Sequence, residues 1–303
     1  MGIAKYIKEI GRGKDGTRAL TRPQAADLFG QVLDGGVTDL EIGAFCLAMR
    51  IKGETDQEMA GFLDATHQRL HTIPQDRAGG ATVVIPSYNG ARKLPLLTPL
   101  LALLLAREGL PVLVHGTATE SSRIFTTEVL AALEIPAHTA IKSIAPGELA
   151  FVPTALLCPG LQRLLEVRQV VGLRNPAHSL VKLMQPCTGQ NLLVSSYTHP
   201  EYALSMAATL TLVGASALLL RGTEGEAVVD PRRTPRMQAF AHGQPLEWQP
   251  PPQDAPGALP APPPSIDAAS TAAYIRQVLA GTQPVPAPIA QQVAQVLHLA
   301  RTL

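Results

Sequence analysis

The sequence predicts an α/β protein in two parts: a small N-terminal all-helical domain, and a larger α/β domain built around a mostly parallel central sheet. Two observations predict this fold class. Residues 1–72 carry apolar residues at helical spacing, with helix-capping residues between the segments. From Ala81 onward, short apolar runs alternate with helical stretches, a pattern typical of a parallel sheet covered by helices on both faces.

Capping signals predict the helices of the first part. Thr21 and Pro23 are typical of the N-cap and the first turn of a helix. A second helix ends at Gly53, and Thr55 with Glu58 forms the capping box of a third. Short helices of this kind suit a dimerising module better than a core that is stable alone, so we expect a homodimer formed through them.

Five strands are predicted for the α/β domain, which we place at residues 80–303. They are Thr82–Ile85, Val112–His115, Ala150–Val152, Leu192–Ser195 and Ala217–Leu220. A helical segment near 158–180 is expected to join the first domain instead. The uncharged stretch Ala203–Leu220 has eighteen residues, near the lower limit for a membrane span. Its glycine and hydroxyl residues favour a helix, a turn and a buried strand, so no contact with a membrane is expected.

Proline dominates residues 244–265, which we interpret as an extended surface loop because proline cannot donate to a strand ladder. A ligand for a peptide-recognition domain is the alternative interpretation of this segment. Two closing helices are predicted after it, at Asp267–Leu279 and Pro288–Leu303.

The net charge is only +1, so no global field points to nucleic acid, and any anion-binding role must come from local clusters. Three cysteines, Cys46, Cys158 and Cys187, share no metal-ligand spacing and favour reduced thiols. The first residues, MGIAKYIKEIGRGK, lack the apolar core of a signal peptide. We therefore expect a cytoplasmic protein.

Residues 37–66, VTDLEIGAFCLAMRIKGETDQEMAGFLDAT, resemble the N-terminal helical domain of the anthranilate phosphoribosyltransferase and nucleoside phosphorylase superfamily, glycosyltransferase family 3. The resemblance continues through VHGTATESSR, VGLRNP and LLLRGTEGE, and so covers most of the chain. The runs IKEIGRGK, PSYNGARK and RGTEGE look most like the YbiB-type branch, the DNA-binding paralogues of these transferases. The fold that the resemblance implies is the one predicted above.

The resemblance also implies where a transferase would hold phosphoribosyl diphosphate. Its glycine-rich diphosphate loop matches residues 86–90, where Pro86 has no N–H to donate and Tyr88 blocks close approach of the backbone. Thr98 matches a serine that contacts phosphate, Arg123 matches a phosphate-binding lysine, and Arg174 matches the arginine that meets the aromatic carboxylate. Cationic positions are thus kept in part, while the loop is changed.

The adjacent Asp-Glu pair that binds magnesium in the transferases falls here at Ala227 and Val228. Glu224 and Glu226 are near but in a different register. The resemblance therefore implies a transferase fold without its leaving-group loop or its metal pair. No cofactor is expected; the alternative is magnesium with phosphoribosyl diphosphate at an altered site of a phosphoribosyl or glycosyl transferase.

Cationic residues are kept where the catalytic groups are lost. This combination favours a protein that binds DNA through its phosphates, without sequence preference, and RNA is the second candidate ligand. The candidate contacts gather in clusters at the N-terminus, around the former phosphate site and further along the chain: Lys5, Lys8, Arg12, Lys14, Tyr88, Asn89, Arg92, Lys93, Thr98, Arg123, Arg174 and Lys182. A ligand sensor or scaffold acting through the helical domain is a third hypothesis, without a residue signature.

Several side chains allow two interpretations. Tyr88 either stacks on a base beside Arg92 and Lys93 or packs on its own domain. His115 is either a general base or a structural histidine, and no partner carboxylate is visible in the sequence. The role of His178 stays open. The segment PRRTPR, residues 231–236, is either a phosphate contact or a basic turn.

Overall fold

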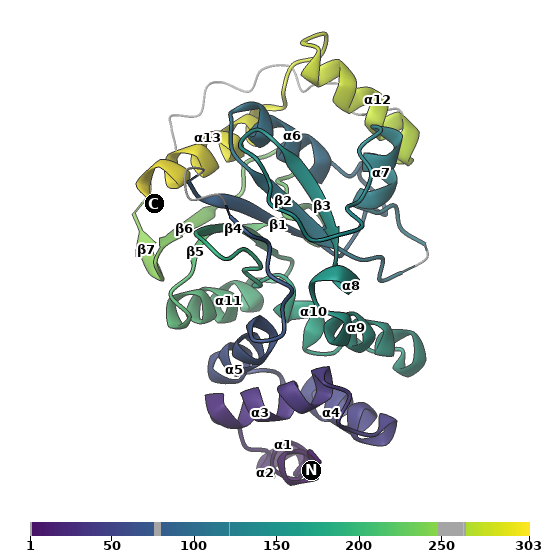
Figure 1. Ribbon diagram of the computed structural model, residues 1–303, viewed down its shortest axis with the longest axis vertical. Coiled ribbons are helices and arrows are strands. Elements are labelled where there is room, and N and C mark those ends of the chain that lie inside the picture. Colours follow the sequence, from purple (N-terminus) through teal and green to yellow (C-terminus); the bar gives the residue numbers. More distant parts are fainter. Residues whose placement is uncertain (1, 76–79, 121, 248–262, 264) are drawn as a thin grey trace.

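The computed structural model describes residues 2–75, 80–120, 122–247, 263 and 265–303, which form a helical layer below an α/β layer (Figure 1). The chain begins in the helical layer with α1 (Ala4–Ile10), α2 (Gly13–Gly16), α3 (Arg22–Leu33), α4 (Asp39–Lys52) and α5 (Asp56–His67). It returns there through α8 (Thr154–Leu157), α9 (Pro159–Val171) and α10 (Ala177–Leu180).

Capping and aromatic packing hold the helical layer together. Thr55 and Glu58 form the expected capping box, and the Glu58 carboxylate also accepts a hydrogen bond from Lys52 Nζ at 2.5 Å. The rings of Phe29 and Phe62 stack with centroids 4.7 Å apart, and Phe45 meets them edge-on. Helix α9 packs closely on α3: a Cβ at Gly160 would collide with the carbonyl of Leu33.

One seven-stranded sheet, in the order β3-β2-β1-β4-β5-β6-β7, forms the α/β layer. Its strands are β1 (Thr82–Ser87), β2 (Val112–Gly116), β3 (Leu149–Pro153), β4 (Asn191–Tyr197), β5 (Ser216–Arg221), β6 (Met237–Ala241) and β7 (Gln244–Leu246). The first five are parallel, and the last two pair antiparallel at one edge. The predicted fold class, helical domain plus mostly parallel sheet, is confirmed.

The prediction of a proline-rich loop from residue 244 is wrong at its start, because residues 244–246 form the edge strand β7. Proline is tolerated there because the outer side of an edge strand has no ladder partner. Residues 248–262 and residue 264 of that segment lie outside the described residues.

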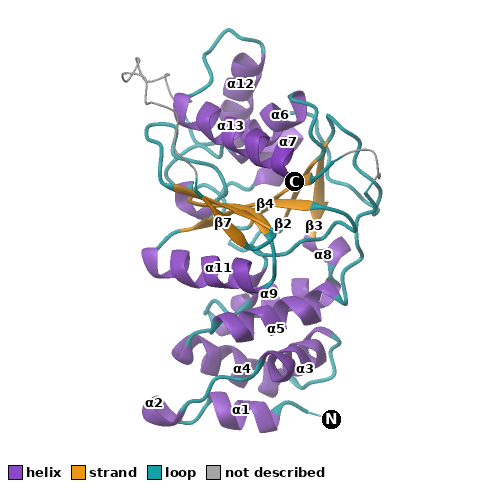
Figure 2. Ribbon diagram, turned by 90° about the vertical axis from the view of Figure 1, so that its left-hand side faces the viewer, coloured by secondary structure: helices purple, strands orange, loops and turns teal. Residues whose placement is uncertain are grey.

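Helices cover both faces of the sheet (Figure 2). On one face lie α6 (Thr98–Arg107), α7 (Thr126–Ala132), α12 (Ala268–Leu279) and α13 (Ala287–Thr302), and on the other lie α11 (Pro200–Leu212) and the helical layer. The uncharged segment expected as helix, turn and strand comprises most of α11, a turn and β5. None of the helices in the described part of the chain is long and apolar enough to span a membrane.

The carboxyl ends of the parallel strands meet at the same edge of the sheet, which is where α/β folds place their ligands. The loop from β1 to α6, residues 88–97, and the loop after β5, residues 222–236, meet there. A short 3-10 turn, Thr223–Gly225, begins the second loop. These two loops form the candidate site.

Candidate functional site

The carboxylate of Glu226 fills the turn that follows β1. Its Oε1 accepts hydrogen bonds from the backbone N–H groups of Asn89 and Gly90, at 2.7 and 2.8 Å. Its Oε2 accepts hydrogen bonds from the hydroxyls of Ser87 and Thr98, at 2.6 and 3.1 Å. Glu226 is 1% exposed, so this anion is sealed inside the protein. Backbone N–H groups that converge on one point are a typical anion-binding arrangement.

A second carboxylate holds the rest of the same loop. Glu224 Oε2 accepts hydrogen bonds from the backbone N–H groups of Arg92, Lys93 and Leu94, at 2.9, 3.0 and 3.2 Å. Burial alone would raise the pKa of Glu224, but these three donors outweigh it and hold the pKa below its usual value. The loop after β5 is thus tied at two points to the loop after β1.

Close backbone contact between the two loops depends on Gly225. Its φ is +90°, and a Cβ there would collide with the side-chain amide of Asn89. Its carbonyl accepts hydrogen bonds from Lys182 Nζ at 2.7 Å and from Ser196 Oγ at 2.8 Å. Glu226 is therefore fixed twice: through the backbone of Gly225 before it, and through the contacts of its own carboxylate.

These residues do not fit a complex of magnesium with phosphoribosyl diphosphate. The loop that matches the diphosphate loop of the transferases already binds Glu226. The positions that match the metal pair are Ala227 and Val228, which are fully buried apolar side chains without an oxygen to offer. A diphosphate would have to displace a buried carboxylate that has four hydrogen-bond donors.

Three candidate contacts, two in this loop and one at the start of α6, were predicted wrongly, because their side chains are buried. Tyr88 is 4% exposed, and its hydroxyl lies 2.8 Å from His115 Nδ1 and 2.9 Å from Thr154 Oγ1, so its ring cannot stack on a base. Asn89 is buried, and Thr98 donates its hydroxyl to Glu226. Burial lowers the pKa of His115 to about 3, which makes it a neutral structural histidine.

Three arginines share one carboxylate near the end of the loop after β2. Arg123 Nε lies 2.8 Å from Glu120, Arg168 forms an ion pair with it, and Arg174 Nη2 lies 4.0 Å away. Burial would raise the pKa of Glu120, but the arginines outweigh it and the pKa is lowered. Arg168 Nη1 is buried and has no hydrogen-bond partner in the described part of the chain. The group carries two positive charges in excess.

A cleft of about 570 Å³, here called the interlayer cleft, lies between the α/β layer and the helical layer. Arg50, Arg174 and Lys182 line it together with His178 and acidic side chains, among them Glu54. Burial lowers the pKa of Lys182 to about 8, and burial with the nearby Arg174 lowers that of His178 to about 4. His178 is therefore neutral at pH 7, and its buried Nε2 has no partner among the described residues.

The other candidate cations lie apart from this cleft. Lys5 and Lys8 are on α1, at the far end of the helical layer, where Lys5 lies 3.8 Å from Asp27 (Figure 1). Arg12 follows α1 and pairs with Glu9 at 2.6 Å. The side chain of Lys14 lies outside the described residues.

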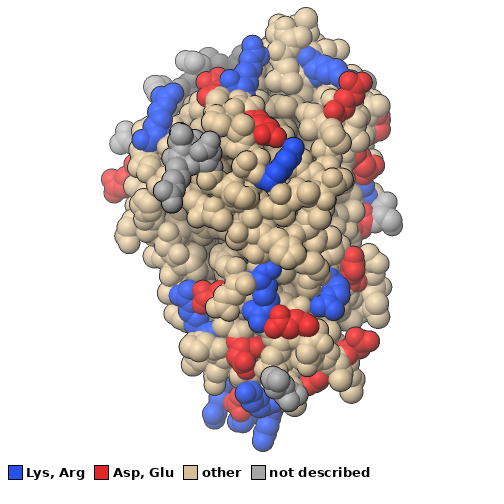
Figure 3. All heavy atoms as spheres, viewed as in Figure 1, with Lys and Arg blue, Asp and Glu red and all other residues tan. Residues whose placement is uncertain are grey.

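Arg92 and Lys93, in the loop after β1, have exposed side chains. Figure 3 shows that Lys and Arg side chains lie at the junction of the two layers and at the tip of the helical layer, with acidic side chains between them. On this face the basic side chains do not form one continuous surface.

The two residues that define the loop, Glu224 and Glu226, were not candidates in the sequence. A local signal existed: two carboxylates in the loop after β5, in a chain whose diphosphate loop had lost its glycines. No local pattern shows that the Glu226 carboxylate accepts a hydrogen bond from the backbone N–H of Gly90, 136 residues earlier in the chain.

Comparison with known proteins agrees with the fold and with the resemblance. A family model described as the helical bundle domain of the glycosyl transferase family matches residues 4–69. The anthranilate phosphoribosyltransferase of Anaeromyxobacter sp. (strain K) is 28% identical over 74% of this chain and 66% of its own length. The protein YbiB of Escherichia coli (strain K12) is 39% identical over 97% of this chain and 93% of its own length.

Solved structures show the same architecture. Anthranilate phosphoribosyltransferase from Thermus thermophilus superposes with a TM-score of 0.73 and 22% identity, covering 98% of this chain and 88% of that chain. The enzyme from Saccharomyces cerevisiae, in complex with PRPP and Mg, superposes with a TM-score of 0.70 and 14% identity, covering 99% and 89%. At these identities the likeness establishes the fold. The chain therefore belongs to the YbiB family and has the fold of anthranilate phosphoribosyltransferase.

Proposed function

We propose that this chain binds DNA, and RNA through the same phosphate contacts, with little sequence preference, and that it transfers no phosphoribosyl group. One observation carries the proposal: three arginines share the single carboxylate of Glu120, with Arg174 open to the interlayer cleft. Unbalanced guanidinium groups beside a cleft attract phosphate oxygens. The loop after β1 also supports the proposal that no phosphoribosyl group is transferred. The Glu226 carboxylate occupies this loop, so the diphosphate site that a transferase needs is closed.

The contacts that we propose are Arg50, Arg174 and Lys182, which line the cleft. Arg92 and Lys93 add exposed charge in the loop after β1, outside the lining of the cleft. The buried side chains of the loop are not part of the proposal. The N-terminal cations are weaker candidates, since Lys5 and Arg12 already face carboxylates.

Titration of fluorescently labelled DNA tests the proposal by polarisation. Arg174→Gln and Arg50→Gln should each weaken binding by about 5- to 20-fold, since a charge-assisted phosphate contact contributes about 1–2 kcal/mol. Arg301→Gln, which removes the same charge from the exposed side of α13, is the matched control and should change affinity less than about 2-fold. Equal losses in all three variants would show that only net charge matters and would contradict the assignment to the cleft.

The same proposal includes a homodimer formed through the helical layer. Helix α4 exposes Leu40, Leu47 and Ile51, which are 84, 48 and 74% exposed, and Val170 at the end of α9 is 89% exposed. Residues 40, 47 and 51 follow one helical stripe, and an apolar stripe of this kind favours burial against a second copy of the same helix.

Light scattering after size-exclusion chromatography tests the dimer. The unmodified chain is expected to elute as a dimer, and Leu40→Glu with Ile51→Glu as a folded monomer. Glu41→Gln on the same helix is not a suitable control, because Glu41 caps α4; Asp39→Asn, at an exposed position of its first turn, leaves the stripe unchanged. A monomeric unmodified chain would overturn this part of the proposal.

A transferase with an altered site is the alternative, and Arg174 supports it because it stands where the transferases bind the aromatic carboxylate. Release of diphosphate from phosphoribosyl diphosphate, measured with magnesium and aromatic amine acceptors, separates the two functions. We expect none, because the leaving-group loop is occupied by Glu226.

A further inference from the structure

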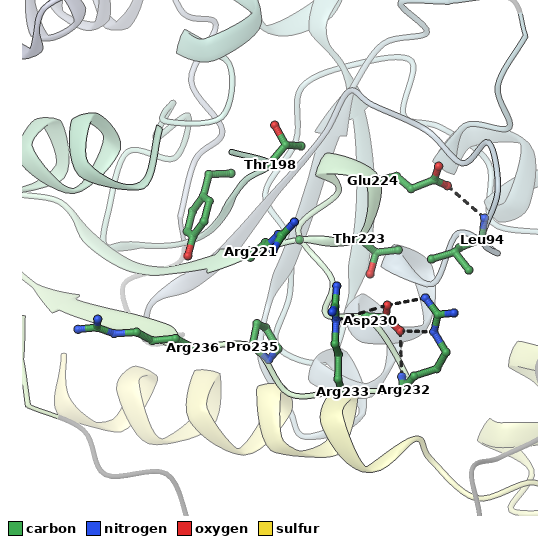
Figure 4. A pocket seen from close by; sticks show the side chains of 12 residues that line it. Leu94, Thr198, Arg221, Thr223, Glu224, Asp230, Arg232, Arg233, Pro235 and Arg236 are labelled. Atoms are coloured by element: carbon green, nitrogen blue, oxygen red, sulfur yellow. Dashed lines mark hydrogen bonds and ion pairs between the residues drawn. The ribbon is translucent and has the colours of Figure 1, made fainter. Parts of the chain in front are cut away.

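A second cavity, of about 510 Å³, lies at the carboxyl end of β5, and Leu94 and Glu224 are part of its lining. Its lining includes four arginines, Arg221, Arg232, Arg233 and Arg236, and two acidic residues (Figure 4). Three of these arginines belong to the segment whose role the sequence left open between a phosphate contact and a basic turn.

The two acidic residues of the lining already have hydrogen-bond donors. Asp230 accepts two hydrogen bonds from the guanidinium of Arg232, at 2.8 and 2.7 Å, and this contact lowers the pKa of Asp230. The Glu224 carboxylate accepts three backbone N–H groups of the loop after β1. Arg233 lies only within 3.9 Å of Asp230 and is 71% exposed. No carboxylate of the described residues pairs with Arg221.

A hydroxyl in the lining has no partner of its own. Thr223 Oγ1 is buried, and no donor or acceptor among the described residues contacts it. In Figure 4 the side chains of Arg221, Thr223 and Arg233 surround the centre of the view, between the end of β5 and the loop that follows, whereas Arg236 extends away from them. An unpaired hydroxyl and two unbalanced guanidinium groups in one cavity are the donors that a phosphoryl group requires.

We propose that this cavity binds the phosphate dianion of a small phosphomonoester, held by Arg221, Arg233 and the hydroxyl of Thr223. Two guanidinium groups match the two charges of a monoester, while a phosphodiester of a nucleic-acid backbone carries one. Asp230 orients the guanidinium of Arg232, which adds a positive charge to the wall of the cavity. The cavity adjoins the interlayer cleft, since Tyr197 and Thr198 line both, but none of the three proposed phosphate donors lines that cleft.

Calorimetry with inorganic phosphate at pH 8, where the dianion dominates, tests the proposal on the full chain at constant ionic strength. We expect saturable binding of one phosphate per chain, weakened about 10-fold or more by Arg221→Gln or Arg233→Gln and abolished in the double variant. Thr223→Val should weaken it about 5-fold. The matched control Arg301→Gln removes the same charge from an exposed position of α13 that lines neither cavity, and it should stay within about 2-fold; far-ultraviolet circular dichroism verifies that each variant is folded.

Three results would overturn the proposal: heat that does not saturate, equal affinity in the double variant, or an equal loss with Arg301→Gln. A competition arm identifies the source of the phosphate. If saturating phosphate displaces labelled DNA from the unmodified chain but not from the double variant, the cavity belongs to the nucleic-acid surface, and the assignment to a small phosphomonoester is wrong. Phosphate binding without any DNA binding would contradict the proposed function and leave this site standing.

Discussion

Replacing Glu226 by alanine tests the reason why the diphosphate loop is closed. The substitution removes a carboxylate that is 1% exposed and accepts hydrogen bonds from two backbone N–H groups and two hydroxyls. The hydroxyl of Ser87 has a second partner, since Ser87 Oγ is already 2.7 Å from Thr126 Oγ1. The N–H groups of Asn89 and Gly90 have no such replacement in the described loop.

The magnitude follows from these contacts. Each buried N–H left without a partner costs about 1–3 kcal/mol, and removal of one partner from a buried charged network costs about 3–5 kcal/mol. We therefore expect Glu226→Ala to lower the free energy of unfolding by about 3–5 kcal/mol, a large part of the roughly 5–15 kcal/mol typical of a domain. Glu226→Gln keeps an oxygen for both N–H groups and should lose only about 1–2 kcal/mol.

Urea unfolding followed by circular dichroism measures these losses, with and without about 0.1 M sodium acetate against sodium chloride of equal ionic strength. Acetate has the size of the group that Glu226→Ala removes, so it should restore part of the stability of this variant and leave the unmodified chain unchanged. Glu108→Ala, at an exposed glutamate after α6, is the matched control and should change stability by less than about 0.5 kcal/mol. A Glu226→Ala variant as stable as this control would refute the account of the loop.

Three further predictions concern the same region. Gly225→Ala should destabilise the chain by about 2 kcal/mol or more in urea unfolding, because its φ of +90° and its contact with Asn89 leave no room for a Cβ; an unchanged midpoint would contradict the described loop. Burial lowers the pKa of His115 to about 3, so between pH 6.5 and 3 the unfolded chain takes up a proton that the folded chain does not, and stability should fall with decreasing pH by up to about 1.4 kcal/mol per pH unit, a contribution that His115→Gln removes from the pH profile. Burial lowers the pKa of Lys182 to about 8, so affinity for DNA should fall as pH rises from 7 to 9, and a Lys182→Gln variant with the same pH profile would exclude Lys182 as a contact.

The parallel sheet was predictable because each buried strand is a short apolar run flanked by turn residues. The five predicted strands lie within β1 to β5 and differ from them by one or two residues at an end. The antiparallel edge was missed for a physical reason. Met237–Ala241 is short and follows a segment rich in arginine and proline, and Pro245 lies inside β7, so no local pattern favours strands there.

The loss of the diphosphate loop was also predictable from local chemistry, since a proline and a tyrosine stand where glycines are needed. What replaced it was not. Tyr88 was interpreted either as stacking on a base or as packing on its own domain, and Thr98 as a phosphate contact, but the fold turns both side chains inward, onto His115 and Glu226. Contacts between segments more than a hundred residues apart depend on how the strands are ordered in the sheet, which periodicity does not reveal.

The salt dependence of DNA binding tests the central claim most directly. Polarisation of a labelled duplex at about 50 and about 200 mM sodium chloride gives the slope of log affinity against log salt, which counts the phosphates contacted. We predict binding with a dissociation constant below ~10 μM at the lower salt, a marked loss at the higher salt, and a slope reduced by about one in Arg174→Gln. Absence of binding below ~10 μM at the lower salt would contradict the proposal that this fold now serves to hold nucleic-acid phosphates.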